Sequence, residues 1–224
     1  MIFLLGGWSS LTAQDVPVTS RVAWSTGTSN SVAGVVVWLA PMDQPSVALQ
    51  PYAQHPRLIQ KNKAFDPHVL VVPVGSVVEF PNRDPFFHNV FSLFDGKRFD
   101  LGLYEAGTTR NVHFDKPGVS YIFCNIHPQM SAVVIAVPAS YYATSDAQGQ
   151  LIIPSVPPGA YMLHIWYEGA LPEDLEKLSR VVTVSERNST LGVLRLKAPS
   201  RVNAHKNKYD RDYDPPNGSG YEQP

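Results

Sequence analysis

Short apolar runs, separated by turns that contain glycine or proline, follow one another from residue 57 to residue 138. Each run is rich in Val, Ile, Tyr and Phe and is too short for a stable helix, so the pattern predicts strands. Dipeptides typical of tight β connections stand between several of them: Val74-Gly75, Asp95-Gly96 and Pro117-Gly118. Seven strands in about 80 residues are enough for one small β-sandwich. The predicted strands are residues 58–60, 68–72, 76–80, 89–94, 110–114, 119–124 and 131–137.

The composition agrees with an all-β chain. The 224 residues include 20 Pro and 15 Gly, which favour turns over long helices. This length accommodates one large β domain or two small ones. The formal net charge is −1 with both signs mixed, so no basic stripe indicates a nucleic acid partner. No apolar run approaches the length of a membrane-spanning helix.

A single cysteine, Cys124, stands in a loop that also offers an imidazole and a thioether. The loop reads C-x2-H-x2-M and contains His127 and Met130, while His88 lies 36 residues before the cysteine. A copper ion that alternates between Cu(I) and Cu(II) needs a soft thiolate, imidazoles that suit both states and a weak axial thioether. A zinc site would more often show paired cysteines. The four residues therefore predict one mononuclear copper site, against the alternative that Cys124 is an inert buried thiol.

Four motifs surround these residues: Gln60–Pro67, Gly75–Asn82, His88-Asn89 and Pro117–Cys124. Together they resemble the motifs of the cupredoxins, the blue-copper electron-transfer proteins, whose fold is a Greek-key β-sandwich. The short C-x2-H-x2-M loop is most similar to that of amicyanin, whereas plastocyanin-like members have a longer spacing before Met. The resemblance covers about 80 of the 224 residues.

This resemblance implies a role for each residue of the predicted site. His88 and His127 would bind a type 1 (blue) copper ion through imidazole nitrogen, and Cys124 would bind it as thiolate. Met130 would be the long axial ligand. Asn89 would lie just outside the ligands and donate its backbone N–H toward the sulfur, a contact that tunes the redox potential.

Three apolar residues next to the ligands are candidates for a rim around the exposed edge of His127: Phe86, Phe87 and Pro128. Such a rim would make the weak, transient contacts that suit fast exchange with a redox partner. The alternative is that the aromatic residues belong to the core. The remaining histidines are expected to be structural or to face solvent: His55, His68, His113, His164 and His205.

The two flanks of this segment carry a second pattern. Ala143–Pro154 and Val156–Trp166 resemble the carboxypeptidase-regulatory-like, transthyretin-type β-sandwich, and Ser31–Leu39 resembles the first strand of that family. A domain tolerates an insertion of this kind when the ends of the insert lie close together. The predicted organisation is a truncated signal peptide at 1–13, the first strands of a split β-sandwich at 14–45, the cupredoxin domain at 46–138, the remainder of the split sandwich at 139–197 and a disordered tail at 198–224.

The two ends of the chain give further expectations. The first eight residues are apolar and are followed by small residues with a suitable cleavage site after Ala13, as in a secretory signal. No Lys or Arg precedes the apolar part, so a buried N-terminal strand is the alternative. Near the other end, the leucines at 171, 175 and 178 predict a short helix, and residues 181–184 and 191–196 predict two closing strands.

The whole arrangement resembles a group of bacterial secreted proteins labelled methylamine-utilisation-like, which implies a periplasmic or secreted location. Phe123 and Pro128 depart from the Gly and Asp typical of that group. Because the four predicted ligands are intact, these departures bear on the polarity of the site and on the partner, not on metal binding. Membership of such a group does not fix a pathway.

The sequence predicts an electron carrier and not an enzyme. Multicopper oxidases and copper nitrite reductases commonly join two coppers through adjacent His and Cys, but here Phe123 precedes Cys124. No hydrolase or P-loop motif occurs. The expected partner is a transient redox protein such as a c-type cytochrome or a quinoprotein dehydrogenase, and the chain is expected to be a monomer. Two alternatives stay open: a periplasmic copper-binding or copper-delivery protein without redox cycling, and a second sandwich that binds a protein or glycan.

Overall fold

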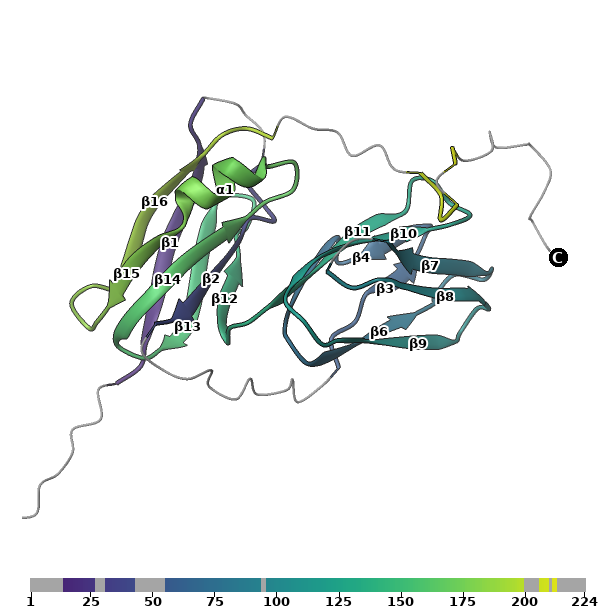
Figure 1. Ribbon diagram of the computed structural model, residues 1–224, viewed down its shortest axis with the longest axis horizontal. Coiled ribbons are helices and arrows are strands. Elements are labelled where there is room, and N and C mark those ends of the chain that lie inside the picture. The colour runs from purple at the N-terminus through teal and green to yellow at the C-terminus, as the bar shows by residue number, and fades with distance from the viewer. Residues whose placement is uncertain are drawn as a thin grey trace, which may run out of the picture.

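The computed structural model describes residues 14–26, 31–42, 55–93, 96–199, 206–209 and 211–212. Within these ranges the chain forms sixteen strands and one short helix, so the predicted all-β class is confirmed. The strands gather in two β-sandwiches that lie side by side (Figure 1). No helix of the described residues is long and apolar enough to cross a membrane. The predicted signal peptide, residues 1–13, lies outside the described residues.

The first sandwich is built from the central part of the chain. Its larger sheet has the strand order β5-β11-β10-β7-β8, and the opposite layer pairs β6 with β9 and β3 with β4. Buried side chains from both layers form one core, to which Phe80, Phe114 and Ile122 contribute. The strands are β3 (Ile59–Lys61), β4 (Ala64–Asp66), β5 (Val69–Pro73), β6 (Ser76–Pro81), β7 (His88–Ser92), β8 (Phe99–Tyr104), β9 (Thr109–Phe114), β10 (Gly118–Cys124) and β11 (Ser131–Val137).

The second sandwich combines strands from both flanks. One of its sheets has the order β13-β1-β16 and the other the order β12-β2-β14-β15, so an N-terminal strand lies in the interior of each sheet. Val37 of β2 stands opposite Ala143 on one side and Ile165 on the other, as the sequence pattern predicts. The domain limits stay a prediction. The strands are β1 (Val16–Trp24), β2 (Val36–Pro41), β12 (Tyr141–Thr144), β13 (Gln150–Val156), β14 (Gly159–Trp166), β15 (Arg180–Val184) and β16 (Thr190–Leu196).

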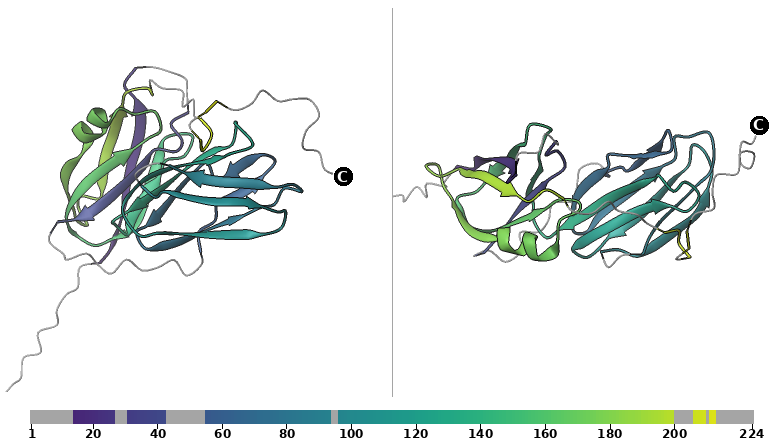
Figure 2. Two further views of the ribbon diagram at one scale, coloured as in Figure 1. Left: turned by 45° about the vertical axis from the view of Figure 1, so that its right-hand side comes forward. Right: turned by 90° about the horizontal axis from the view of Figure 1, so that it is seen from above.

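A third apolar cluster joins the two sandwiches. Val133, Ile135 and Val137 point out of the first sandwich and are buried in one cluster with Val36 and Trp166 of the second. Alternate residues of the same strand, β11, face the core of the first sandwich instead. Strands β2 and β11 are thus buried on both faces, which explains why each reads as a continuous apolar run and not as an alternating one. Figure 2 shows the two sandwiches packed against each other from two further directions.

Several strands were not predicted individually from the sequence, among them β1, β4 and β8. In β8, Gly102 has a φ of 65° and the pairing with β7 shifts between Asn89 and Phe91, so a bulge breaks the alternation of buried residues. In β1 alternate residues do face inward, but the polar Ser20 stands between the two fully buried residues, Val18 and Val22. A bulge or a polar residue in the inward row hides a strand from a search for strict apolar alternation.

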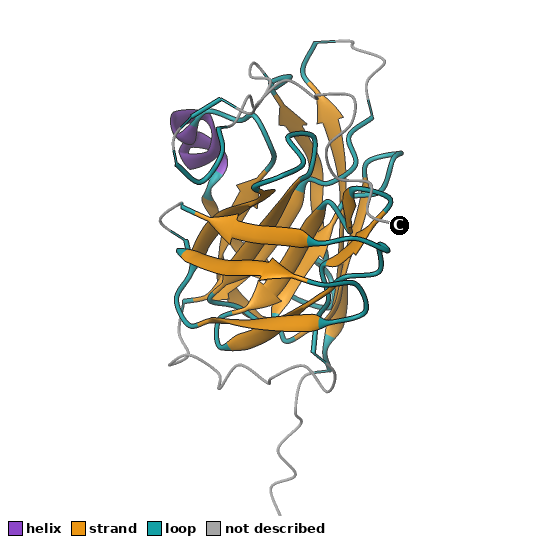
Figure 3. Ribbon diagram, turned by 90° about the vertical axis from the view of Figure 1, so that its right-hand side faces the viewer, coloured by secondary structure: helices purple, strands orange, loops and turns teal. Residues whose placement is uncertain are grey.

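The predicted short helix and part of the tail are also seen. Helix α1 (Pro172–Leu178) begins with a proline in its first turn and packs Leu175 and Leu178 against the second core; it is the purple coil in Figure 3. The tail was expected to be disordered from residue 198. Residues 206–209 and 211–212 nevertheless have defined positions, because Lys208 finds hydrogen-bond partners on the first sandwich.

Candidate metal site

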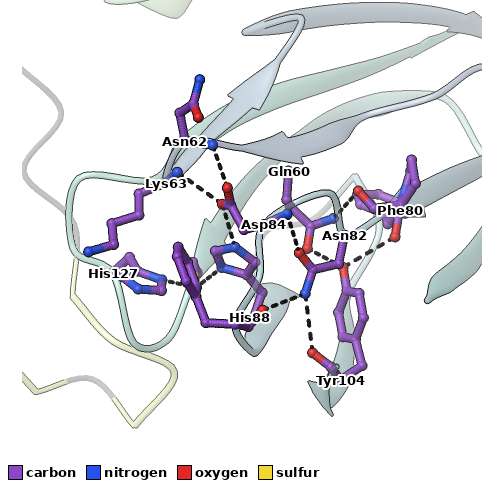
Figure 4. A network of polar contacts seen from close by, with 12 residues as sticks. Gln60, Asn62, Lys63, Phe80, Asn82, Asp84, His88, Tyr104 and His127 are labelled. Carbon is purple, nitrogen blue, oxygen red and sulfur yellow. Dashed lines mark hydrogen bonds and ion pairs between the residues drawn. The ribbon is translucent and has the colours of Figure 1, made fainter. Parts of the chain in front are cut away.

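The candidate site lies at one end of the larger sheet of the first sandwich. Cys124 is the last residue of β10 and His88 is the first residue of β7, and these neighbouring antiparallel strands place the two residues at the same end. His127 comes from the loop between β10 and β11 (Figure 4 shows both histidines). The fold therefore brings residues 36 positions apart into one cluster.

Three donor atoms converge there. The Sγ atom of Cys124 lies 3.6 Å from Nδ1 of His88 and 3.5 Å from Nδ1 of His127. All three atoms lie within 4.8 Å of one another, close enough to share one metal ion. Cys124 and His88 are fully buried, whereas His127 is half-buried. One of the two imidazoles thus reaches toward solvent and the other does not.

Met130 closes the loop that carries His127. Its backbone N–H donates to the carbonyl of His127 at 3.0 Å, and its own carbonyl accepts from the N–H of Cys124 at 3.2 Å. The Met130 side chain is fully buried in the same apolar cluster as Cys124. The structure thus brings three of the four predicted ligands together and places the fourth in the same core; their binding of a metal stays a prediction.

The surroundings of the Cys124 sulfur favour a thiolate only in part. Burial raises the pKa of the thiol, while hydrogen bonds from the backbone N–H groups of Ile126, Asn89 and His127 act in the opposite direction. The net pKa is raised, so a proton must leave when a metal binds. The N–H group of Asn89 thus lies beside the sulfur, and its effect on a bound metal stays a prediction.

Asp84 fixes the orientation of His88, a role that the sequence did not reveal. Its Oδ2 atom lies 2.9 Å from Nε2 of His88, and both groups are buried. Because a carboxylate only accepts hydrogen bonds, Nε2 carries the proton and Nδ1 is left with a lone pair toward the sulfur. Burial lowers the pKa of His88 below its usual value, and the contact with Asp84 opposes this only in part.

A tight hairpin holds Asp84 in its ionised form. Asn62 and Lys63 connect β3 to β4 and both have positive φ, 56° and 55°, as a two-residue hairpin turn of type I′ requires. Their N–H groups donate to the two carboxylate oxygens at 2.6 and 3.0 Å. Burial alone would raise the pKa of Asp84, but these bonds and the contact with His88 outweigh it and lower the pKa. Figure 4 shows the carboxylate between the turn and the imidazole.

Asn82 shapes the loop that precedes His88. Its side-chain oxygen accepts from the N–H of Asp84 at 3.0 Å, and its amide group donates to the carbonyl of Phe86 at 2.8 Å. Asn82 is fully buried, so these bonds are shielded from water. An Asn two residues before a loop Asp is the signal from which this local structure could have been recognised.

One aromatic side chain, Phe86, lies beside both histidines, and further apolar residues adjoin the ligands in sequence. The ring of Phe86 lies 5.3 Å from that of His88 and 5.5 Å from that of His127, while Phe87 and Ile126 are 43% and 44% exposed. Burial, then the nearby His88 and Lys63, lower the pKa of His127 to about 4. The imidazole is therefore neutral at physiological pH and available to a metal.

The other histidines lie away from this cluster. His55 contacts Glu79, His68 contacts Glu168, and His164 stacks on Trp38. His113 is exposed, and His205 lies outside the described residues. Among the described residues, His88, Cys124 and His127 are the group of His, Cys, Asp or Glu side chains found to be arranged for a metal ion.

In comparisons with known proteins, this chain matches solved structures over less than half of its length. No family model matches the chain, and no curated protein matches it. Among solved structures, a Cu-containing nitrite reductase from Thermus scotoductus SA-01 is 26% identical with a TM-score of 0.36 over 38% of this chain and 22% of that chain. A purple cupredoxin from Nitrosopumilus maritimus is 24% identical, with a TM-score of 0.34 over 37% of this chain and 99% of that chain. A reduced amicyanin mutant is 19% identical, with a TM-score of 0.36 over 45% of this chain and 98% of that chain. The chain spans about a fifth of the length of the nitrite reductase.

Proposed function

We propose that this chain is a mononuclear type 1 copper protein that carries single electrons between periplasmic redox partners. The observation that carries the proposal is the convergence of one cysteine sulfur and two Nδ1 atoms within 4.8 Å in a largely buried site. A single cysteine in the chain limits the site to one thiolate. Three resemblances of the sequence are part of this proposal. The ligand loop resembles that of amicyanin, and the second sandwich resembles carboxypeptidase-regulatory-like domains. The whole chain resembles methylamine-utilisation-like secreted proteins.

The donor set fits copper better than zinc. A thiolate with two imidazoles and a distant thioether is the combination that serves both Cu(I) and Cu(II). Structural zinc sites more often have two or more thiolates. His88, Cys124 and His127 would hold the ion, with Met130 as the axial ligand. Bound copper would supply a one-electron couple.

Hydrogen bonds within the chain hold these donors in position. Asp84 holds the ring of His88, and the hydrogen bonds between Cys124, His127 and Met130 keep the loop closed. Three backbone N–H groups donate hydrogen bonds to the sulfur and would withdraw part of the negative charge of the thiolate. A site that moves little between oxidation states exchanges electrons with little reorganisation.

The half-buried His127 is the proposed point of exchange with a partner. We expect Phe86, which lies beside the His127 ring, and the sequence neighbours Phe87, Ile126 and Pro128 to form its rim. A small apolar surface of this kind suits weak and transient contacts. A c-type cytochrome or a quinoprotein dehydrogenase is the proposed class of partner. We propose a carrier and not an enzyme, because Phe123 stands where an enzyme with a second copper would have a histidine next to Cys124.

Addition of Cu(II) to the purified protein tests the proposal. One copper per chain and an intense thiolate-to-copper band at roughly 600 nm are expected. Cys124→Ser should lose the band, since only the sulfur supplies the transition. A colourless Cu(II) complex in the wild-type protein would contradict electron transfer and favour copper binding or delivery without redox cycling.

A further inference from the structure

The part of the tail that the structure describes returns to the metal site. After β16 ends at Leu196, residues 206–209 lie at the end of the first sandwich that carries the loop following β10 (the yellow ribbon in Figures 1 and 4). The backbone N–H of Lys208 donates to the side-chain oxygen of Asn125 at 3.0 Å. Asn125 directly follows Cys124.

The side chain of Lys208 makes a second contact on the same face. Its Nζ lies 2.8 Å from Oδ2 of Asp100 on β8, and the lysine side chain is only 20% exposed. The other oxygen of this carboxylate accepts from the amide group of Asn89 at 2.7 Å. A chain of charge-assisted hydrogen bonds therefore runs from Lys208 through Asp100 to Asn89.

Both contacts end on residues that adjoin ligands. Asn89 follows His88, its backbone carbonyl accepts from the N–H of Asn125 at 2.9 Å, and its N–H lies on the Cys124 sulfur. Lys208 thus contacts Asn125, the residue after Cys124, directly. It contacts Asn89, the residue after His88, through Asp100. Neither contact uses a ligand atom.

Hydrogen bonds of Asn207 fold the segment around Lys208 into a turn. The side-chain oxygen of Asn207 accepts from the N–H groups of Tyr209 and Arg211 at 2.9 and 3.2 Å, and its own N–H donates to the carbonyl of Arg211 at 2.9 Å. A turn closed by its own hydrogen bonds loses less conformational entropy when it docks. Lys208 lies inside that turn.

We propose that Lys208 is a positioning residue of the metal site, by which the C-terminal segment holds Asn89 and Asn125 in place and so raises the reduction potential and slows metal loss. The proposal rests on the proposed copper function. Without the lysine, the N–H group of Asn89 would withdraw less charge from the sulfur, and a positive charge that disfavours the oxidised site would be absent. Both effects lower the potential.

Voltammetry and copper release from full-length variants test this role. Lys208→Met should lower the reduction potential and release copper to an added chelator about tenfold faster. Tenfold is the lower end of the loss of metal affinity that follows mutation of residues just outside the ligands. Lys208→Arg, which keeps the charge and the donor, should restore both values. Lys116→Met removes an exposed lysine from the turn before β10, at the opposite end of that strand from Cys124, and should behave as wild type.

Amide hydrogen exchange in the Cu(I) protein adds a direct readout. The Asn89 N–H should exchange faster in Lys208→Met and not in Lys116→Met. Equal potentials, release rates and exchange rates in Lys208→Met and wild type would overturn the proposal, as would equal effects of the two Met variants. If wild type binds Cu(II) without colour, the electron-carrier function fails, while the release rates still decide on Lys208: faster loss from Lys208→Met supports its role and equal loss refutes it.

Discussion

Asp84 accepts a hydrogen bond from Nε2 of His88 at 2.9 Å, and this contact turns Nδ1 of the histidine toward the Cys124 sulfur. The carboxylate is held in turn by the N–H groups of the β3–β4 turn. A metal-binding imidazole whose outer nitrogen is fixed by a carboxylate is both oriented and made more basic. The orientation of His88 therefore depends on a hairpin that contributes no ligand.

Replacement of Asp84 should weaken Cu(II) binding without removing a ligand. Asp84→Asn keeps the shape but loses the negative charge that makes His88 a stronger donor, so we expect a higher reduction potential and about 10- to 100-fold weaker Cu(II) binding. Competition with a chelator and voltammetry measure the two quantities. Asp115→Asn, which removes an exposed carboxylate paired with Lys97, is the matched control and should change neither.

The axial position gives a second prediction. Met130→Leu should keep the blue colour and raise the reduction potential, because loss of a weak donor disfavours Cu(II). Met130→Gln, which offers a harder oxygen, should lower it. Met130 is fully buried, but leucine has nearly the same volume and should cost less than about 1.5 kcal/mol of stability. Unchanged potentials in both variants would show that the Met130 sulfur lies away from the metal.

Proton release on metal binding follows from the pKa values of the site. The pKa of His127 is about 4, so its ring is neutral at pH 6, and the pKa of His88 is also lowered, whereas the raised pKa of Cys124 keeps the thiol protonated. Metal binding at pH 6 should therefore release one proton from Cys124 and less than one from His88, and affinity should fall at least tenfold for each pH unit of acidification. Histidines of ordinary pKa would bring the total to about 2.5.

Calorimetric titrations of the metal-free protein in buffers of different ionisation enthalpy count these protons. Below pH about 4, protonation of His127 should add a further proton and steepen the fall in affinity. A release of two or more protons at pH 6 would mean that the imidazoles are not held neutral by burial.

The ligand cluster could be predicted from sequence because its chemistry is local. Cys124, His127 and Met130 share one loop of fixed spacing, and His88 begins a recognisable strand. Asp84 was missed because its role depends on two N–H groups that reach it across the fold from the β3–β4 turn. No local pattern reports such a contact.

The less regular parts of the fold were hidden for other reasons. A bulge disrupts the alternation of β8, and the polar Ser20 interrupts the inward row of β1. The polar composition of the tail gives no sign that Lys208 has partners on the first sandwich. The continuous apolar run that ends in β2 predicts one strand. The structure shows that its continuity reflects burial on both faces, one of which lies where the two sandwiches meet.

That shared face changes what is expected of the first sandwich alone. A fragment of residues 55–138 keeps its own core and every predicted ligand, but it exposes Val133, Ile135 and Val137, which are at most 2% exposed in the full chain. An apolar patch on a sheet of this kind promotes self-association. The fragment should therefore bind copper and also aggregate at concentrations where the full chain does not.

Two neighbouring residues of β11 separate this effect from simple loss of stability. Ile135 faces the second sandwich and Val134 faces the core of the first. Ile135→Ser should cost the full chain about 3 kcal/mol of unfolding free energy, because a buried side chain is lost at the shared face. In the fragment the same change should cost little and should reduce aggregation. Val134→Ser should destabilise both forms. Chemical denaturation and light scattering of the four variants give the answer: if Ile135→Ser destabilises the fragment as much as the full chain, the second sandwich does not cover this face in solution.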